Sequence, residues 1–183
     1  DGGTTFIDVP ANGIISIPAG VLNVIVRTPT VNDTLGEPVE SFGVTLSAPV
    51  GVTISPTAAS VTNTIEASDP VTVSIANGTS VVEGNPSVFT ITLSNLSTQA
   101  TTVTFNTSDG SAVAPGDYTA QATVTVTIPA GQQSVTVPVV TNDDAIAGES
   151  PETINGTISG VTGGNGATIA TATALGTITD NDG

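Results

Sequence analysis

Residues 124–139 read Val-Thr-Val-Thr-Ile-Pro-Ala-Gly-Gln-Gln-Ser-Val-Thr-Val-Pro-Val. Apolar and polar residues alternate on both sides of the Ile-Pro-Ala-Gly turn, which is the pattern of β-strands with one buried face. The same alternation recurs in short runs separated by Gly, Pro, Asn, Ser and Asp. Its other apolar positions fall within residues 71–75, 89–93, 103–105, 154–158 and 175–178. These runs predict an all-β fold, an immunoglobulin-like antiparallel β-sandwich of about seven strands.

An internal repeat suggests how the chain is organised. Ile-Pro-Ala-Gly occurs at residues 17–20 and again at 128–131, and an acidic segment of the form Asn-Asp…Glu-x-x-Glu follows each copy, at 32–40 and at 142–152. Residues 17–69 thus align with residues 128–182. We predict a partial or atypical module over residues 1–69, equivalent to the C-terminal half of a module, and a complete module over residues 70–183.

Three explanations of the partial module remain open at this stage. The sequence begins within a module, or the first module has an atypical short fold, or a strand from another chain completes it by β-strand addition. Each explanation must account for the exposed apolar face and the unpaired strand edge that half of a sandwich would have.

Composition narrows the function classes. The 183 residues include 16 acids and a single basic residue, Arg27, for a formal net charge of −15. Such a surface repels nucleic acid and anionic membranes, and no apolar run is long enough for membrane insertion. Cys and His are absent, which removes thiolate and imidazole metal sites and the usual Ser-His-Asp or Cys-His nucleophiles. We therefore expect no enzyme.

The acids of the complete module lie in loops that are expected to share one end of the sandwich. Alternate inter-strand loops lie at the same end, so the loop after the first strand, the loop before the fourth, the loop after the fifth and the chain exit meet there. Carboxylates at such a pole repel one another unless a hard cation lies among them. Calcium takes six to eight oxygen ligands, and carboxylates with loop carbonyls provide them. The sequence therefore predicts bound Ca²⁺.

The ordered motifs resemble those of the Calx-β domain family. They are Val82-Glu83-Gly84, Ser108-Asp109-Gly110, Gly116-Asp117-Tyr118, Asn142-Asp143-Asp144, Glu149…Glu152 and the terminal Ile178-Thr179-Asp180-Asn181-Asp182. The resemblance covers nearly all of residues 71–182 and extends more weakly to residues 17–69. It implies a seven-stranded sandwich with calcium at one end, as found in sodium–calcium exchangers, in integrin β4 and, in tandem, in large bacterial surface proteins and adhesins.

By the same resemblance eight acids match the ligand positions of the family: Glu83, Asp117, Asp143, Asp144, Glu149, Glu152, Asp180 and Asp182. A main-chain carbonyl near Ala145 or Ile146 is also implied. The segment between Asp144 and Glu149 is longer than the family pattern, so whether Asp143 or Asp144 binds stays open. Asn181 stands where the family often has an acid. For Asp109, in Ser-Asp-Gly, a turn role is favoured over a ligand role.

The partial module keeps only part of this set. Its acids at corresponding positions are Asp33, Glu37, Glu40 and Asp69. The counterpart of Glu83 lies in the missing half, and that of Asp117 is replaced near Thr4 and Thr5. We expect calcium binding there to be weaker or absent.

These features predict a calcium-rigidified spacer of an extracellular adhesin or other cell-surface protein, of bacterial origin. Its expected partners are calcium ions and neighbouring modules of the same or identical chains. An alternative is a self-assembling extracellular filament subunit whose partial sandwich is completed by a neighbour's strand. A regulatory calcium sensor fits less well, because the chain nearly lacks Lys and Arg and is built of repeats.

Overall fold

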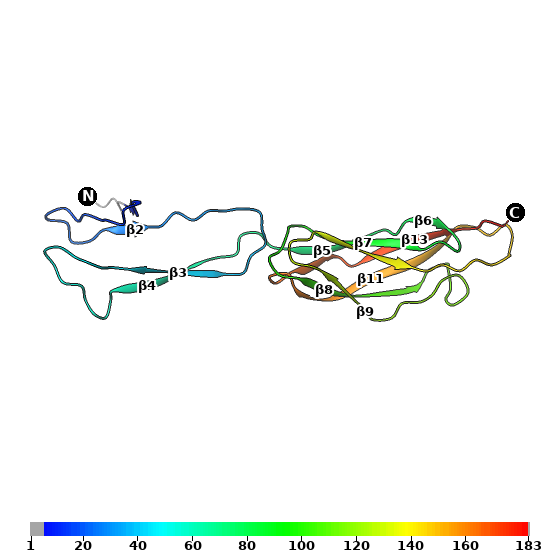
Figure 1. Cartoon of the computed structure of the whole chain (residues 1–183). Coiled ribbons are helices and arrows are strands. Elements are labelled where there is room, and N and C mark those ends of the chain that lie inside the picture. Colours follow the sequence, from blue (N-terminus) through cyan, green and yellow to red (C-terminus); the bar gives the residue numbers. More distant parts are fainter. Residues whose placement is uncertain (1–5, 183) are drawn as a thin grey trace. The chain divides into compact units, whose positions relative to one another are not determined.

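The computed structural model describes residues 6–182, which form thirteen β-strands and no helix (Figure 1). In the described part of the chain no segment therefore qualifies as a membrane-spanning helix. The chain divides into two compact units, of which the first ends at Asp33 and the second begins at Thr34. This boundary differs from the repeat boundary at residues 69 and 70, because compactness follows spatial contacts whereas the repeat follows sequence motifs.

The first unit contains one small parallel sheet. Strand β1 (Phe6–Asp8) pairs with β2 (Ile25–Arg27). The Arg27 guanidinium donates hydrogen bonds to the Asp8 carboxylate, and it lies 5.9 Å from the centre of the Phe6 ring. The basic residue of the chain is thus engaged inside this unit.

The second unit opens with a two-stranded antiparallel hairpin. Strand β3 (Glu40–Thr45) pairs with β4 (Ser60–Ile65). No hydrophobic side chain among the described residues up to position 69 is buried, and several are almost fully exposed, including Leu22 (100%), Val31 (96%) and Val50 (97%). The buried hydrophobic residues begin at Val71.

From residue 72 onward the chain forms the predicted β-sandwich. One sheet has the order β10-β7-β5-β12 and the other the order β6-β13-β11-β8-β9. The strands of the first sheet are β5 (Thr72–Ala76), β7 (Ser87–Leu93), β10 (Ser134–Val139) and β12 (Thr168–Thr171). Those of the second are β6 (Ser80–Val82), β8 (Thr101–Asp109), β9 (Val124–Ile128), β11 (Glu152–Gly163) and β13 (Thr173–Thr179).

The seven strands expected from alternation are all present, which confirms the all-β sandwich. They correspond to β5, β7, β8, β9, β10, β11 and β13, and their mutual pairings are antiparallel. Alternation did not reveal β6 and β12. These short strands add to the sheet edges in parallel, β6 beside β13 and β12 beside β5. The Ile-Pro-Ala-Gly turn carries the chain from β9 in one sheet to β10 in the other.

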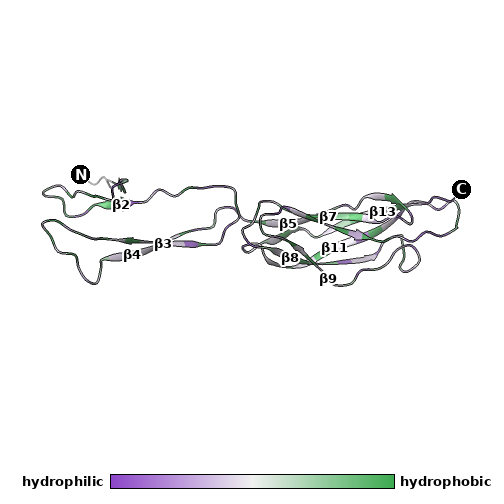
Figure 2. Ribbon diagram, in the orientation of Figure 1, coloured by the Kyte–Doolittle hydropathy of each residue, from purple (hydrophilic) through white to green (hydrophobic). Residues whose placement is uncertain are grey.

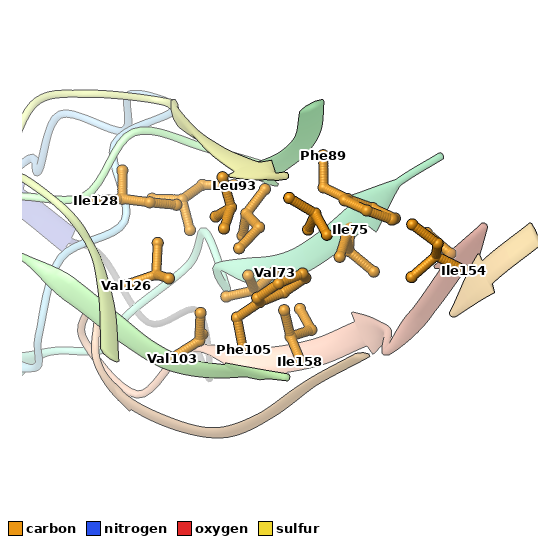
Figure 3. Close-up of a cluster of buried hydrophobic side chains, with 14 of the residues drawn as sticks. Val73, Ile75, Phe89, Leu93, Val103, Phe105, Val126, Ile128, Ile154 and Ile158 are labelled. Carbon is orange, nitrogen blue, oxygen red and sulfur yellow. The ribbon is translucent and has the colours of Figure 1, made fainter. Parts of the chain in front are cut away.

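The aliphatic core fills the space between the two sheets (Figure 3). Strands β7 and β13 carry strongly apolar residues (Figure 2). Phe89 and Phe105 are fully buried, with ring centroids 5.6 Å apart and planes at 52°, an arrangement that aromatic pairs favour.

The Phe89 ring fits because glycines surround it. A Cβ atom placed on Gly156 would lie 2.7 Å from the ring, one on Gly176 3.1 Å and one on Gly78 3.2 Å. These three glycines come from separate segments, so the ring depends on small residues across the interior of the sandwich.

Replacing Phe89 with Ala should destabilise the sandwich by about 3–5 kcal/mol, because the glycines around the ring cannot fill the cavity. Urea denaturation of the full chain measures the loss. Phe6→Ala is the control, since Phe6 is 52% exposed and lies in the other unit; its effect on the sandwich transition should be near zero. Equal effects of the two substitutions would contradict this description of the core.

Candidate metal centre

Three chain segments meet at the end of the sandwich that carries the C-terminus (Figure 1). Strand pairing places them there. Val82 pairs with Thr179, and Glu152 pairs with Ile178. The Glu83 N–H donates to the Thr179 carbonyl at 3.0 Å. The start of the β6–β7 loop, the end of the β10–β11 loop and the residues after β13 are therefore neighbours.

Two groups of carboxylates form at this end, and Glu83 belongs to both. The first group is Glu83, Asp144 and Glu149, and the second is Glu83, Asp180 and Asp182. In each group one oxygen from every residue lies within 4.8 Å of the others. Glu83 is only 7% exposed, which is rare for an acid without a charged partner.

Main-chain groups hold the acidic loops in place. Asp180 Oδ2 accepts hydrogen bonds from the N–H groups of Gly148 at 2.7 Å and Glu149 at 3.0 Å. Asp180 Oδ1 accepts from the Asp182 N–H at 2.6 Å. Asp144 Oδ1 accepts from the Ile146 N–H at 2.7 Å. The β10–β11 loop and the chain end are thus joined through Asp180.

Two asparagines also organise the site, and sequence reasoning did not give them this role. Asn142 Nδ2 donates to the carbonyls of Pro115 at 2.7 Å and Gly116 at 2.9 Å, which brings the Asp117 loop to the β10–β11 loop. Asn181 Nδ2 donates to Asp143 Oδ1 at 2.7 Å, and the Asn181 N–H donates to Glu83 Oε1 at 3.1 Å. The repetition of Asn-Asp at residues 32–33 and 142–143 was a signal for Asn142.

The pKa values record the crowding of negative charge. Desolvation, followed by the charges of Asp144 and Glu83, raises the pKa of Glu149. Burial, followed by the neighbouring charges of Asp117 and Glu149, raises the pKa of Glu152. The folded chain thus holds protons at these two acids more strongly than the unfolded chain. Their contribution to stability is unfavourable above their folded pKa values and is relieved as the pH falls through them.

The residues at this end fit a hard divalent cation. Asp182 Oδ2 is buried and has no hydrogen-bond partner within the described residues, and buried polar atoms are normally paired. The second unit, from residue 34 onward, contains no Lys or Arg to neutralise the acids. Its donors at this end are carboxylate and main-chain oxygens, the ligands that calcium prefers.

All eight candidate ligands of the complete module take part in this acidic end. Asp143 is held through Asn181, and Asp117 lies beside Glu152. The four acids of the partial module are not brought into these groups: neither group of candidate ligands found in residues 6–182 includes Asp33, Glu37, Glu40 or Asp69. Ligand roles for either set remain predictions.

Asp109 has a local structural role. Its Oδ1 accepts a hydrogen bond from the Tyr118 hydroxyl at 2.7 Å and one from the Ala114 N–H at 3.1 Å. The hydrogen bond from Tyr118 is the main reason why the pKa of Asp109 is lowered. Burial, with this hydrogen bond, raises the pKa of Tyr118 to about 12. The pair closes the loop that carries Asp117, in keeping with the expected turn role.

The fold and the acidic end of the sandwich together define the class of protein. It is a β-sandwich module whose inter-strand loops form a candidate cation site. The model of the Calx-beta domain matches residues 66–182. The chain belongs to the Calx-β domain family, which confirms the resemblance drawn from its motifs. Calx-β domains are calcium-binding and non-catalytic.

Solved structures agree on the fold. An apo-form Calx CBD1 domain is 19% identical, covers 62% of this chain and all of its own, and has a TM-score of 0.53. CBD12 from CALX1.2 is 17% identical over 60% of this chain and 44% of its own, with a TM-score of 0.52. The Calx CBD2 domain is 10% identical over 60% and 86%, with a TM-score of 0.50. Comparison with curated proteins found no significant match.

Asp109→Asn should destabilise the chain at neutral pH, and the difference from the wild type should shrink below about pH 4. The lowered folded pKa means that the carboxylate contributes stability above its unfolded value of 3.8, which is lost as the pH falls through the folded value. Thermal unfolding in chelator across this range tests it. The control is Glu66→Gln, which removes an exposed charge elsewhere in the chain. A constant difference for Asp109→Asn down to pH 2 would refute the assignment.

Proposed function

We propose that residues 70–183 form a complete, non-enzymatic calcium-binding module that serves as a calcium-stiffened spacer in an extracellular or cell-surface protein of the bacterial adhesin type. The observation that carries the proposal is the sharing of Glu83 by two carboxylate groups drawn from three chain segments. Such a set gathers against electrostatic repulsion, and a divalent cation offsets that repulsion.

The geometry favours two cation positions with Glu83 between them. Asp144 and Glu149 would complete the first position, and Asp180 and Asp182 the second. Of the two adjacent aspartates we assign Asp144 to the first position, because Asp144, and not Asp143, belongs to the carboxylate group with Glu83 and Glu149. Asp117 and Glu152 flank the first position, and the carbonyl of Ala145 or Ile146 supplies a further oxygen.

Calcium would act on this chain by joining loops that otherwise repel one another. Without it, burial and the neighbouring charges, which raise the pKa values of Glu149 and Glu152, make these two acids unfavourable for folding at neutral pH. With it, the β6–β7 loop, the β10–β11 loop and the chain end share ligands. Binding to the folded state alone stabilises that state by mass action, so the module stiffens where calcium is abundant.

The balance of charge supports an extracellular role. Extracellular calcium modules bind Ca²⁺ with dissociation constants of about 10⁻⁴–10⁻³ M, whereas the sites of regulatory sensors bind it more tightly. With 16 acids and one base, the chain suits an environment in which millimolar divalent cations screen and bind its surface. We therefore favour the spacer over a regulatory sensor.

Calcium at about 100 times its dissociation constant should stabilise the module by ~2.7 kcal/mol for each cation position that it fills. Glu149→Gln with Glu152→Gln should abolish the gain from the first position, which these two residues line, and leave that of the second. In chelator, however, the double variant should melt above the wild type, because it lacks two charges that repel their neighbours. Differential scanning calorimetry in calcium and in chelator measures both effects.

Glu37→Gln with Glu40→Gln is the matched control, since it removes the same pair of charges from the corresponding motif of the partial module. This variant should keep the full calcium response of the sandwich. The proposal fails if the wild type melts at the same temperature in calcium and in chelator.

A filament subunit is the second candidate function. It is favoured by the absence of buried hydrophobic side chains among residues 6–69, where Leu22, Val31 and Val50 are almost fully exposed. Strands β3 and β4 pair only with each other among the described residues. We propose that residues 1–69 form a partial module, whose edges are open to strand addition by an identical chain.

If such assembly occurs, the chain should form regular polymers in electron micrographs, and Val61→Lys on the exposed face of β4 should reduce their number at least tenfold. Val61 is 56% exposed, and a charged side chain at a sheet edge opposes further pairing. Monodisperse monomers of the wild type at high protein concentration would rule out the filament and leave the spacer.

A further inference from the structure

The other end of the sandwich binds a stretch of main chain from the partial module. Gly36 is buried there against the loop formed by residues 94–99. The Gly36 N–H donates to the Leu96 carbonyl at 2.7 Å, and the Thr98 N–H donates to the Gly36 carbonyl at 3.4 Å. Gly36 also forms a parallel bridge with Ser97. The contact is made through backbone atoms on both sides.

A second loop adds a side chain that recognises the same carbonyl. Asn165 Nδ2 donates to the Gly36 carbonyl at 2.5 Å, and it also lies 2.9 Å from Thr98 Oγ1 and 3.1 Å from Ser97 Oγ. Asn165 therefore links the bound segment to the loop that holds it.

The turn that presents Asn165 has an uncommon backbone. Residues 163–166, Gly-Gly-Asn-Gly, all have positive φ, of 75°, 59°, 54° and 85°. Asn is among the few residues with a side chain that adopt this conformation readily. The three glycines and the asparagine together allow a sharp turn that still carries a side-chain amide donor.

The bound segment must carry glycine. A Cβ atom on Gly36 would lie 2.2 Å from Val71 Cγ2 and 3.3 Å from the carbonyl oxygens of Asp69 and Leu96. Val71 is 3% exposed and belongs to the core, so it has little room to move. The backbone at Gly36 therefore lies closer to the sandwich than a residue with a Cβ atom could come.

We propose that residues 94–99 and 163–166 form a docking surface for an extended, glycine-containing segment of the preceding module, and that Asn165 anchors this segment through its main-chain carbonyl. This inference rests on the proposed division of the chain into modules, but not on calcium. The partner it fits is a module with glycine directly before a Glu-x-x-Glu motif, as in Gly36-Glu37. The complete module carries the same feature at Gly148-Glu149, where an added Cβ would meet nothing within 4 Å.

Amide hydrogen exchange on the full chain in chelator tests the docking surface. In the wild type the amides of Gly36 and Thr98 should be protected. Asn165→Gly keeps the positive φ while removing the amide group, and it should speed exchange at both positions by at least about tenfold. Gly36→Ala should speed exchange in the same way at the substituted position and at Thr98. Amides of β5 and β7 should be unchanged in both variants.

Nuclear spin relaxation separates docking from a merely local contact. In the wild type the amides of β3 and β4 should tumble with those of the sandwich, and in Asn165→Gly they should reorient about twofold faster. Gly43→Ala is the control, because its Cβ would meet nothing within 4 Å. Unprotected Gly36 in the wild type, or hairpin tumbling unaffected by Asn165→Gly, would overturn the proposal. Neither result would bear on calcium binding at the acidic end.

Discussion

Repulsion among the carboxylates at one end of the sandwich is the constraint on which the structure depends. Strand pairing forces it: once β6 and β11 both pair with β13, Glu83 and Glu152 lie beside the residues that follow β13. The hydrophobic core fixes those pairings, so Glu83, Glu152 and the residues that follow β13 cannot separate without disrupting the sheet. The buried carboxylate of Glu83 and the unpartnered Asp182 Oδ2 are the local result within the described chain.

The two ends of the sandwich therefore depend on different physical chemistry. The acidic end gathers charge, and its proposed order comes from a cation. The opposite end has no comparable carboxylate group among residues 6–182, and it recognises main-chain atoms through Leu96, Thr98 and Asn165. Both ends are built from loops, whereas the sheets between them supply a rigid core. In this account calcium stiffens a module, and a glycine contact joins it to its neighbour.

The sequence alone predicted the strands that bury one face, because apolar and polar residues alternate along such strands. It did not reveal β6 and β12, since three or four residues at a sheet edge are too few to alternate. Because alternate inter-strand loops lie at the same end of a sandwich, the sequence predicted that Glu83, Asp144 and Asp180 would lie close together. The roles of Asn142, Asn181 and Asn165 were not predicted, because a side-chain amide that donates to a carbonyl or carboxylate oxygen leaves no periodic pattern in the sequence. The compact unit ending at Asp33 was also unforeseen, since its boundary falls inside the acidic motif of residues 32–40.

A crystal structure of the chain grown with calcium well above the millimolar range would test the central claim most directly, with anomalous scattering to identify the ion. We expect cations at about 2.3–2.6 Å from the carboxylate oxygens of Glu83 and its partners in both groups. Well-ordered loops at that end with hydrated carboxylates and no bound cation would contradict it.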